Sequence, residues 1–355
     1  MKEKKRFMTL TMILTTDCNL NCSYCFCGKK YKKYMDIRAA KKYIDFFKQF
    51  SIGNPSICLF GGEPLLNLNI IEEICDYIKY IFNEHVVISI TTNGTLINNE
   101  VMEIVRKYNI QVQVSIDGYS DTHNLSRKFY NGKGSWDLII NNIFNYFDTL
   151  PMIRLTYTPD TISDLSNNIE KLVGMGFFNI VFMPIDDSSW KNNLEQYIHE
   201  YEKICQFYYE CFANNKGIYF IEFDNIIRSY IYNLSNSCKP GMLQISIDPE
   251  GNIFPCNRVN FTDTRLCLGT VEKGFDNRYN RLIKDIEKRD NICINCDLYN
   301  RCIECKIENY ESTGKFELKN DYKCSMNKEK IYAIDRMAAK LYSNKISSFY
   351  SRFYT

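Results

Sequence analysis

Short apolar runs alternate with helical patterns from residue 7 to about residue 215. Six runs have the length of strands, and they cover residues 7–14, 57–60, 86–90, 110–116, 153–157 and 178–183. Between them, apolar residues recur at spacings of three and four, as at positions 40, 43, 44, 47 and 50. That spacing is typical of amphipathic helices. Six strand–helix units in succession predict an α/β fold with a parallel sheet, and we expect a partial (β/α)6 TIM-like barrel in preference to an open doubly wound sheet.

Polar signatures follow the first four of these runs. They are Cys18, Cys22 and Cys25, then Gly61-Gly62-Glu63-Pro64, then Thr92-Asn93-Gly94, then Ser115, Asp117 and Gly118. In folds of this class the carboxyl ends of the strands carry the active site. The recurrence predicts one site built from successive strand ends.

The character of the sequence changes beyond a connecting strand expected at residues 219–223. From Cys238 the chain is rich in cysteine and turns, and residues 248–252 carry a hairpin signal. We expect a small metal-stapled domain here, because the segment offers little apolar core of its own. A last amphipathic helix includes Ile331, Ile334 and Leu341 on one face. The expected domains are therefore residues 1–215, residues 216–325 and a C-terminal helix within 326–355 that packs on the body.

Composition and charge exclude several function classes. The chain has 355 residues, of which 45% are hydrophobic and 24% charged, with a net charge of +2. These values are typical of a globular protein and give no general attraction to nucleic acid. The apolar run at 7–14 is too short to cross a bilayer and is not followed by a cleavage site. We expect a cytoplasmic protein with no nucleic-acid or membrane partner.

Sixteen cysteines are the unusual feature of the composition. In a reducing compartment thiols stay free, so clustered cysteines indicate metal binding. Four of them fall within residues 18–27 and eight within residues 238–324. The isolated Cys58, Cys75, Cys205 and Cys211 lie in strand or helix patterns and are expected to be core thiols.

Cys18, Cys22 and Cys25 offer three thiolates from one tight loop. A [4Fe-4S] cubane takes four cysteine ligands as a rule, so three leave one iron open to a substrate. A structural zinc site is the alternative, and it needs four nitrogen or sulfur ligands. Cys27 is close enough in sequence to be a fourth, but residues two apart at a loop-to-helix junction rarely converge on one ion. We therefore favour the cluster.

The motifs together resemble the radical S-adenosylmethionine (SAM) superfamily over residues 7 to about 215. The resemblance rests on CxxxCxxC, GGEP, TNGTLI and SIDG at successive strand ends. It implies that the open iron chelates the amino and carboxylate groups of SAM. One electron then releases methionine and a 5′-deoxyadenosyl radical, which takes a hydrogen atom from the substrate.

The resemblance also implies which residues contact SAM. Tyr24 would lie near the adenine, and the GGEP turn with Glu63 would meet the methionine amino group. Ser115 and Arg127 would bind the carboxylate and ribose. The complete expected set is Tyr24, Gly61, Gly62, Glu63, Pro64, Asn93, Ser115, Asp117 and Arg127. Taken singly, GGEP is usually a turn, Arg127 a surface charge and Asp117 a turn residue.

The later cysteines resemble the SPASM extension of peptide-modifying radical enzymes, which carries two auxiliary [4Fe-4S] clusters. By position, Cys293, Cys296, Cys302 and Cys324 would hold one cluster, and Cys238, Cys256 and Cys305 the other. In chain order the sixth of these seven cysteines is Cys305. The family usually has three residues between the fifth and the sixth, whereas this chain has two between Cys302 and Cys305. Either Cys267 supplies the missing fourth ligand or that cluster keeps an open iron. The alternative for the whole region is a pair of zinc knuckles.

Proteins with this extension act mostly on peptides or proteins. Sulfatase-maturing members tend to carry an aspartate base directly after the second SPASM cysteine, where this chain has Asn257, which cannot accept the proton. We therefore expect a maturase of a ribosomal peptide that forms a thioether or C–C cross-link. A peptide epimerase with Cys27 as hydrogen donor, a sulfatase-maturase-like protein modifier and a small-molecule (sugar or aminocyclitol) dehydrogenase are the alternatives.

The partners follow from the same resemblance. A flavodoxin or ferredoxin would supply electrons, and an anaerobic source is expected because an open iron is sensitive to oxygen. The cysteine triplet begins at residue 18, which leaves no room before it for a domain that binds a leader peptide. Recognition of a precursor peptide would then fall to the barrel mouth, the SPASM surface or a separate leader-binding protein.

Overall fold

The structure is a computed structural model that describes residues 5–27, 32–83, 85–235, 238–261 and 263–354. These residues form two compact units. The first unit comprises residues 1–115, 124–151 and 239–287, and the second comprises residues 116–123, 152–238 and 288–355.

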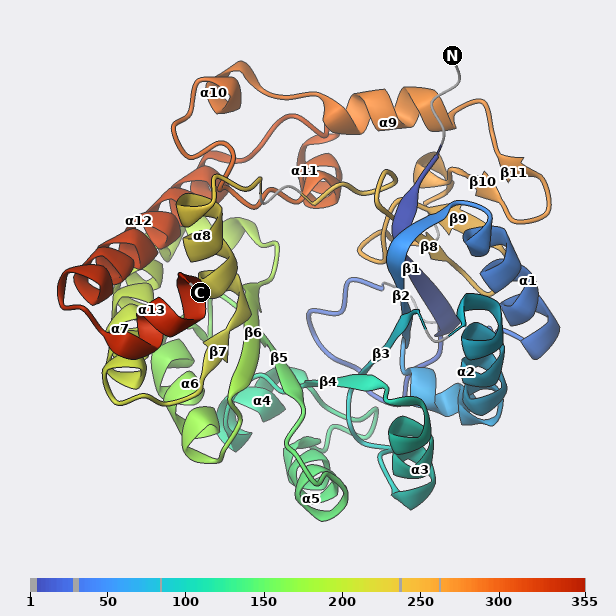
Figure 1. Ribbon diagram of the computed structural model, residues 1–355, viewed down its shortest axis with the longest axis horizontal. Helices are drawn as coiled ribbons and strands as arrows, with labels where there is room; N and C mark the ends of the chain where they lie inside the picture. Colours follow the sequence, from blue (N-terminus) through green and yellow to red (C-terminus); the bar gives the residue numbers. More distant parts are fainter. Residues whose placement is uncertain (1–4, 28–31, 84, 236–237, 262, 355) are drawn as a thin grey trace. The chain divides into compact units, whose positions relative to one another are not determined.

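The first unit is built on a sheet with strand β1 (Phe7–Thr15) at its centre (Figure 1). The parallel neighbours on one side run in the order β2, β3, β4, and β8 pairs in parallel on the other side. Beyond β8 the sheet continues as antiparallel β9, β10 and β11. The bounds are Ser51–Gly61 (β2), Val87–Thr92 (β3), Gln111–Ser115 (β4), Gln244–Ile247 (β8), Asn252–Phe254 (β9), Gly269–Thr270 (β10) and Gly274–Phe275 (β11).

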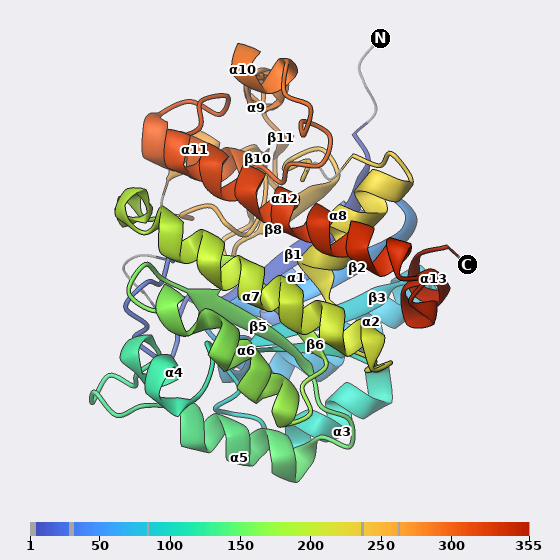
Figure 2. The ribbon, with the colours of Figure 1, turned by 90° about the vertical axis from the view of Figure 1, so that its left-hand side faces the viewer.

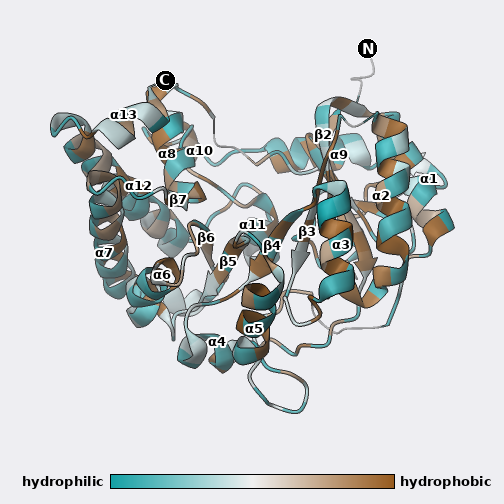
Figure 3. Cartoon of the chain, turned by 60° about the horizontal axis from the view of Figure 1, so that its bottom comes forward, coloured by the Kyte–Doolittle hydropathy of each residue, from teal (hydrophilic) through white to brown (hydrophobic). Residues whose placement is uncertain are grey.

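Helices α1 (Ile37–Lys48), α2 (Leu68–Phe82) and α3 (Asn99–Tyr108) connect the parallel strands β1, β2, β3 and β4 in chain order. Helices α5 (Trp136–Tyr146) and α9 (Tyr279–Glu287) also belong to the first unit, whereas the residues of α4 (Ser120–Ser126) divide between the two units. Both α1 and α3 begin at a capping side chain, because Asp36 accepts a hydrogen bond from the backbone of Ala39 and Asn98 from that of Val101. Helices α2 and α3 carry both hydrophobic and hydrophilic stretches (Figure 3), and their apolar residues form the buried side.

The second unit combines three parallel strands with a layer of helices. Strands β5 (Met152–Tyr157), β6 (Asn179–Pro184) and β7 (Tyr219–Phe220) pair in that order. The helices are α6 (Leu165–Gly174), α7 (Leu194–Ala213), α8 (Ile221–Ile231), α10 (Asn291–Ile294), α11 (Lys306–Thr313), α12 (Asp321–Ser343) and α13 (Ser347–Phe353). Short 3-10 helices occur in both units. Those of the first unit are Pro64–Asn67 and Thr264–Leu266, and those of the second unit are Ile162–Asp164 and Ser188–Asn192.

Aromatic side chains fill the core of the second unit. Tyr201 packs on Phe182 and Phe223, and Tyr208 stacks on Phe220 with 4.4 Å between ring centroids. Helix α12 lies alongside α7 (Figure 2). Buried Ile331, Ile334, Met337 and Leu341 make up much of the apolar side of α12, as the sequence pattern indicates.

The structure confirms the mixed α/β fold class with parallel strands, and five of the six expected strands agree with it to within one or two residues. Strand β2 begins six residues before its expected start at 57. The hairpin at 248–252 joins β8 and β9, with Gly251 at φ +84° in its turn. The strand expected at 219–223 is wrong beyond its first two residues, because α8 begins at Ile221. The two packing units follow other boundaries than the expected domains 1–215, 216–325 and 326–355, which stay a prediction.

Candidate cofactor and cluster sites

The CxxxCxxC loop leaves the end of β1 with one buried and two partly exposed thiols. Cys18 is buried, whereas Cys22 and Cys25 are partly exposed. The Cys18 sulfur accepts a hydrogen bond from the backbone N–H of Leu20 at 3.4 Å, and the N–H of Cys25 donates to the carbonyl of Cys22 at 3.2 Å. One tight loop thus offers three soft sulfur donors, which suits an iron–sulfur cluster.

A second segment holds this loop in place from the side. The backbone of Asn21 donates to the carbonyl of Lys128 at 2.7 Å, and that of Ser23 donates to Ser126 at 3.1 Å. Arg127 stands between Ser126 and Lys128 in the sequence, and its guanidinium lies 5.4 Å from the ring centroid of Tyr24. Two residues that were expected to contact SAM, although about a hundred positions apart, therefore meet beside the cysteines.

The GGEP turn is pressed against the end of β1. The N–H of Gly62 donates to the carbonyl of Thr15 at 2.9 Å, and that of Glu63 donates to the carbonyl of Asp17 at 2.8 Å. A Cβ atom at Gly61 or Gly62 would lie 2.2 Å from the carbonyl oxygen of Thr15 or Asp17, respectively. The glycine pair is therefore needed for close backbone approach next to Cys18.

Replacing Gly62 with alanine is expected to lower the free energy of unfolding by roughly 1–3 kcal/mol, since the methyl group meets backbone that cannot rotate away. It should also weaken binding of SAM, because the displaced Asp17 carbonyl precedes Cys18. Urea unfolding and equilibrium dialysis with SAM measure the two effects. Gly217→Ala is the matched control, because a Cβ atom there meets nothing within 4 Å. Equal results for the two variants would contradict this role of Gly62.

Glu63 is fully buried and uses both carboxylate oxygens inside the protein. One oxygen accepts from the Thr92 hydroxyl at 2.7 Å and the Leu65 N–H at 3.1 Å, and the other accepts from the Asn93 N–H at 2.7 Å. Burial raises the pKa of Glu63 to about 7, against the opposing effect of these hydrogen bonds. Glu63 thus joins the GGEP turn to the Thr92-Asn93 turn, a role that the sequence motif does not reveal.

Asn93 links the third strand end to the first cysteine. Its Nδ2 lies 3.8 Å from the Cys18 sulfur and 2.8 Å from Oδ1 of Asn19, while its own Oδ1 accepts from Thr95. A donor at a ligand sulfur favours the thiolate over the thiol. The structure therefore gives Asn93, included in the expected set without a stated role, a contact with an expected cluster ligand.

Ser115 and Asp117 lie at the end of β4, and both are buried. Asp117 Oδ1 accepts a hydrogen bond from the Thr156 N–H at 2.9 Å, and the Asp117 N–H donates to Nδ1 of His123 at 3.2 Å. These contacts give Asp117 a structural role at the ends of β4 and β5. Its expected contact with SAM stays a prediction, as does that of Ser115.

Four of the later cysteines line a single pocket in the second unit. Cys293, Cys296, Cys302 and Cys324 are also the four that the SPASM resemblance assigns to one auxiliary cluster. Apolar side chains, among them Leu298 and Ile331, form part of the same wall. Burial raises the pKa of the Cys293 thiol. The structure thus brings this predicted ligand set together, although its members span 32 positions of sequence.

The other predicted auxiliary set divides between the two units. Cys256 and Cys267 belong to the first unit, while Cys238 and Cys305 belong to the second. Cys267 is buried, and its thiol donates to the carbonyl of Gly269 at 3.2 Å. Within the parts of the chain that are described, no group of three or more His, Cys, Asp or Glu residues is arranged around a single metal ion.

Cys75, Cys205 and Cys211 are core thiols, as expected. All three are buried, and burial raises the pKa of Cys75 to about 12 and that of Cys211 to about 11. Cys58 is only half-buried. These buried thiols are inert to metals and oxidants at neutral pH.

Residues 12–172 match the family model of the Radical SAM superfamily. These residues form a radical SAM domain. The matched segment contains the CxxxCxxC loop, the GGEP turn, Asn93 and Arg127. The domain identifies a radical SAM enzyme and implies SAM and a [4Fe-4S] cluster as its cofactors.

Three relatives extend the comparison of this radical SAM protein. Uncharacterized protein MJ0907 of Methanocaldococcus jannaschii is 40% identical over 127 residues, which are 36% of this chain and 44% of that protein. The radical SAM cyclopropyl synthase TigE of Paramaledivibacter caminithermalis is 25% identical over 84% of this chain and 67% of its own length. A cysteine-type anaerobic sulfatase-maturating enzyme of Clostridium novyi is 24% identical over 83% of this chain and 87% of its own length.

Solved structures show the same fold. Native anSMEcpe with bound AdoMet superposes with a TM-score of 0.82 at 22% identity, covering 94% of this chain and 99% of that one. Streptococcus suis SuiB bound to the precursor peptide SuiA superposes with a TM-score of 0.60 at 16% identity, covering 90% of this chain and 76% of that one. At these identities the likeness establishes the fold of the radical SAM protein and not its substrate.

Among the helices described for this radical SAM protein, none is long and apolar enough to span a bilayer. The expected cytoplasmic location stays a prediction.

Sequence reasoning did not find the Glu63 bonds, the Asn93 contact with Cys18 or the contact of Lys319 with Cys302. Apart from the bond between Glu63 and Leu65, each joins residues that are distant in the chain, so no local spacing indicates it.

Proposed function

We propose that this radical SAM enzyme matures a ribosomally made peptide by forming a thioether or C–C cross-link. The observation that carries the proposal is the pocket lined by Cys293, Cys296, Cys302 and Cys324, which adds a second cysteine site to the CxxxCxxC loop. Relatives whose names denote peptide or protein modification, a sulfatase-maturating enzyme and SuiB with its precursor peptide, support the substrate class.

Cys18, Cys22 and Cys25 would hold the radical-generating cluster. When bound, the cluster and SAM supply a 5′-deoxyadenosyl radical that removes a hydrogen atom from the peptide. Tyr24 and Arg127 would bind and orient SAM, because they lie together beside the cysteine loop. The glycines of the GGEP turn would allow the methionine end to approach the backbone, and Pro64 would begin the short helix that follows.

The same proposal includes two auxiliary [4Fe-4S] clusters, one held by the pocket cysteines and one by Cys238, Cys256 and Cys305. Cys267 is the candidate fourth ligand of the latter. Its hydrogen bond to Gly269 would have to be given up for iron, since a ligand must be deprotonated. The alternative is an open iron to which a substrate thiolate binds.

Iron content tests the cluster count. Anaerobic reconstitution of the full chain is expected to give about twelve iron atoms per chain, because each of three cubanes holds four. Cys296→Ala/Cys324→Ala should remove about four of them, while Cys75→Ala, which changes a core thiol, should remove none. A wild-type content of about four or fewer atoms would contradict the auxiliary clusters.

A sulfatase-maturase-like activity is the second candidate, favoured by the fold likeness to anSMEcpe over nearly the whole of both chains. Asn257 opposes it, because a neutral amide cannot act as the base. Epimerisation of a peptide and dehydrogenation of a small molecule are weaker candidates, because no contact of the described residues favours either. Electron donation by flavodoxin or ferredoxin and help from a leader-binding protein belong to the same proposal.

Mass spectrometry distinguishes these products. The reduced enzyme is incubated with SAM and with synthetic peptides encoded by short open reading frames next to its gene. A loss of two hydrogen atoms from one peptide indicates a cross-link. A mass that is unchanged after reaction in H₂O but raised by one deuterium after reaction in D₂O indicates epimerisation. A synthetic sulfatase-derived peptide serves as the third arm. Conversion of that peptide alone would favour the second candidate over cross-linking.

A further inference from the structure

Lys319 places its ammonium group against one of the pocket cysteines. Its Nζ donates a hydrogen bond to the sulfur of Cys302 at 3.4 Å. Lys319 precedes α12 and lines the same pocket as the four cysteines. A lysine amine is a cation at neutral pH, because its ordinary pKa lies well above 7.

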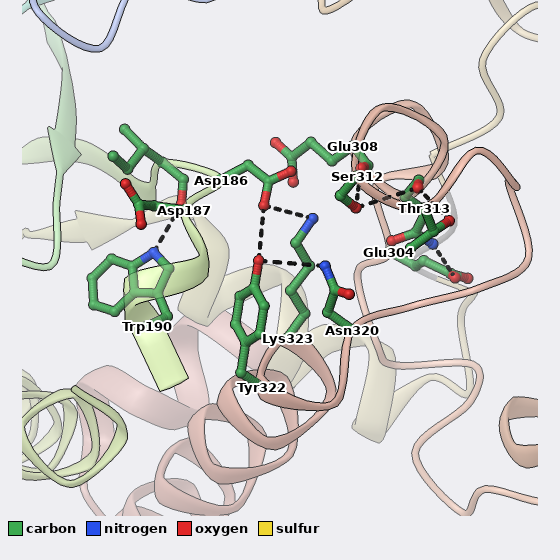
Figure 4. A network of polar contacts seen from close by, with 12 residues as sticks. Asp186, Asp187, Trp190, Glu304, Glu308, Ser312, Thr313, Asn320, Tyr322 and Lys323 are labelled. Atoms are coloured by element: carbon green, nitrogen blue, oxygen red, sulfur yellow. Dashed lines mark hydrogen bonds and ion pairs between the residues drawn. The ribbon is translucent and has the colours of Figure 1, made fainter. Parts of the chain in front are cut away.

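The carboxylate that lines the same pocket is paired with other groups. Glu304 (Figure 4) also lines the pocket, but its Oε2 lies 3.0 Å from Nζ of Lys306 and its Oε1 accepts a hydrogen bond from Asn309 at 2.7 Å. Within the described residues, no ion pair joins Lys319 to a carboxylate. Its charge therefore acts mainly on the cysteine sulfurs.

The acidic residue that follows β6, Asp186, engages a different lysine. Asp186 lies 2.8 Å from Nζ of Lys323 and accepts from the Tyr322 hydroxyl at 3.1 Å (Figure 4). Those contacts tie the first turn of α12, which carries Cys324, to the end of β6. They hold one wall of the pocket without compensating the charge of Lys319.

The walls of the pocket strengthen this electrostatic interaction. Ile292, Leu298, Tyr299 and Ile331 contribute apolar surface to it. An ionic hydrogen bond in such surroundings is stronger than the same bond in water, because the local dielectric constant is lower. Reduction of an iron–sulfur cluster adds one negative charge, and hydrogen bonds to its sulfurs favour the reduced state.

We propose that Lys319 is a positioning residue that raises the reduction potential of the auxiliary cluster held by Cys293, Cys296, Cys302 and Cys324. This inference rests on the proposed function, because it requires that cluster to form. A higher potential makes the cluster a better electron acceptor. In thioether formation one C–H and one S–H bond break and one C–S bond forms. One hydrogen atom goes to the 5′-deoxyadenosyl radical, one proton goes to water, and the remaining electron passes to this acceptor.

A redox titration monitored by electron paramagnetic resonance tests the proposal. The titrations are done in a Cys18→Ala/Cys22→Ala/Cys25→Ala background, which removes the signal of the first cluster. Lys319→Met removes the charge and the donor at similar volume, and Lys319→Arg retains both. Lys328→Met is the matched control, because Lys328 lines the same pocket and no sulfur contact of its amine is found among the described residues. Iron and sulfide are measured on every sample.

Lys319→Met is expected to lower the midpoint potential of one cluster with iron content unchanged. Lys319→Arg should stay near the parent value, and Lys328→Met should shift it less than Lys319→Met. An unchanged potential in fully loaded Lys319→Met would overturn the proposal. Loss of iron in Lys319→Met but not in Lys319→Arg would also overturn it, by making Lys319 an assembly residue. Absence of auxiliary iron from the parent protein would instead refute the proposed function.

Discussion

Cys22→Ala is expected to abolish the formation of 5′-deoxyadenosine from SAM. The loop offers Cys18, Cys22 and Cys25 as the ligands of the radical-generating cluster, and the loss of one thiolate leaves too few to hold it. Liquid chromatography with mass detection, after reduction by dithionite, measures the product. The yield should fall to the level without enzyme, and the iron content should fall by about four atoms per chain.

Cys27→Ala is the matched control for this variant. Cys27 lies in the same segment and is also partly exposed, but it falls outside the CxxxCxxC spacing. It should leave both the yield and the iron content near the wild-type values. If Cys22→Ala retained the wild-type yield, or if Cys27→Ala lost as much as Cys22→Ala, the assignment of the ligands would be wrong.

Glu222→Ala is expected to lower the free energy of unfolding by about 3–5 kcal/mol, because it leaves a buried cation without its partner. Lys330 of α12 donates to Glu222 of α8, and their side chains are only 6% and 15% exposed. Burial acts to lower the pKa of Lys330, but Glu222 and Tyr197 outweigh it and raise the pKa. Urea unfolding at neutral pH, followed by circular dichroism, measures the change.

A second ion pair on the same helix provides the control. Glu202→Ala removes the partner of Arg336, a pair in which both side chains are more than half exposed. An exposed pair is worth under about 1 kcal/mol, so this variant should be nearly as stable as wild type. Equal destabilisation by the two substitutions would show that burial of the Lys330 pair does not determine its contribution.

The sequence pattern predicted most of the parallel strands well because each carries apolar residues at alternating positions, and those residues are buried, as in β3 and β5. The prediction failed at the start of β2, where polar and turn-forming residues occupy strand positions. The first residues of β2 include Gly53, Asn54 and Pro55, which read as a turn. It failed again at 221–223, where the short apolar run is equally compatible with a buried helix.

The parts of the candidate site that consist of short sequence motifs could be predicted from the sequence. CxxxCxxC and GGEP are each contained in a few residues, and their positions at strand ends predicted that they meet. The contacts of Glu63, Asn93 and Lys319 depend on packing between distant segments, as with the 75 positions that separate Asn93 from Cys18. Such contacts need the folded chain, because neither periodicity nor motif spacing encodes which polar atoms face each other.

Reductive cleavage of SAM by the wild-type chain tests the central claim most directly. The anaerobically reconstituted protein is mixed with dithionite and SAM, and 5′-deoxyadenosine and methionine are quantified together. The account predicts that both products form in equal amounts, because one broken sulfur–carbon bond releases one of each. Intact SAM in the presence of a fully loaded, reduced protein would contradict it.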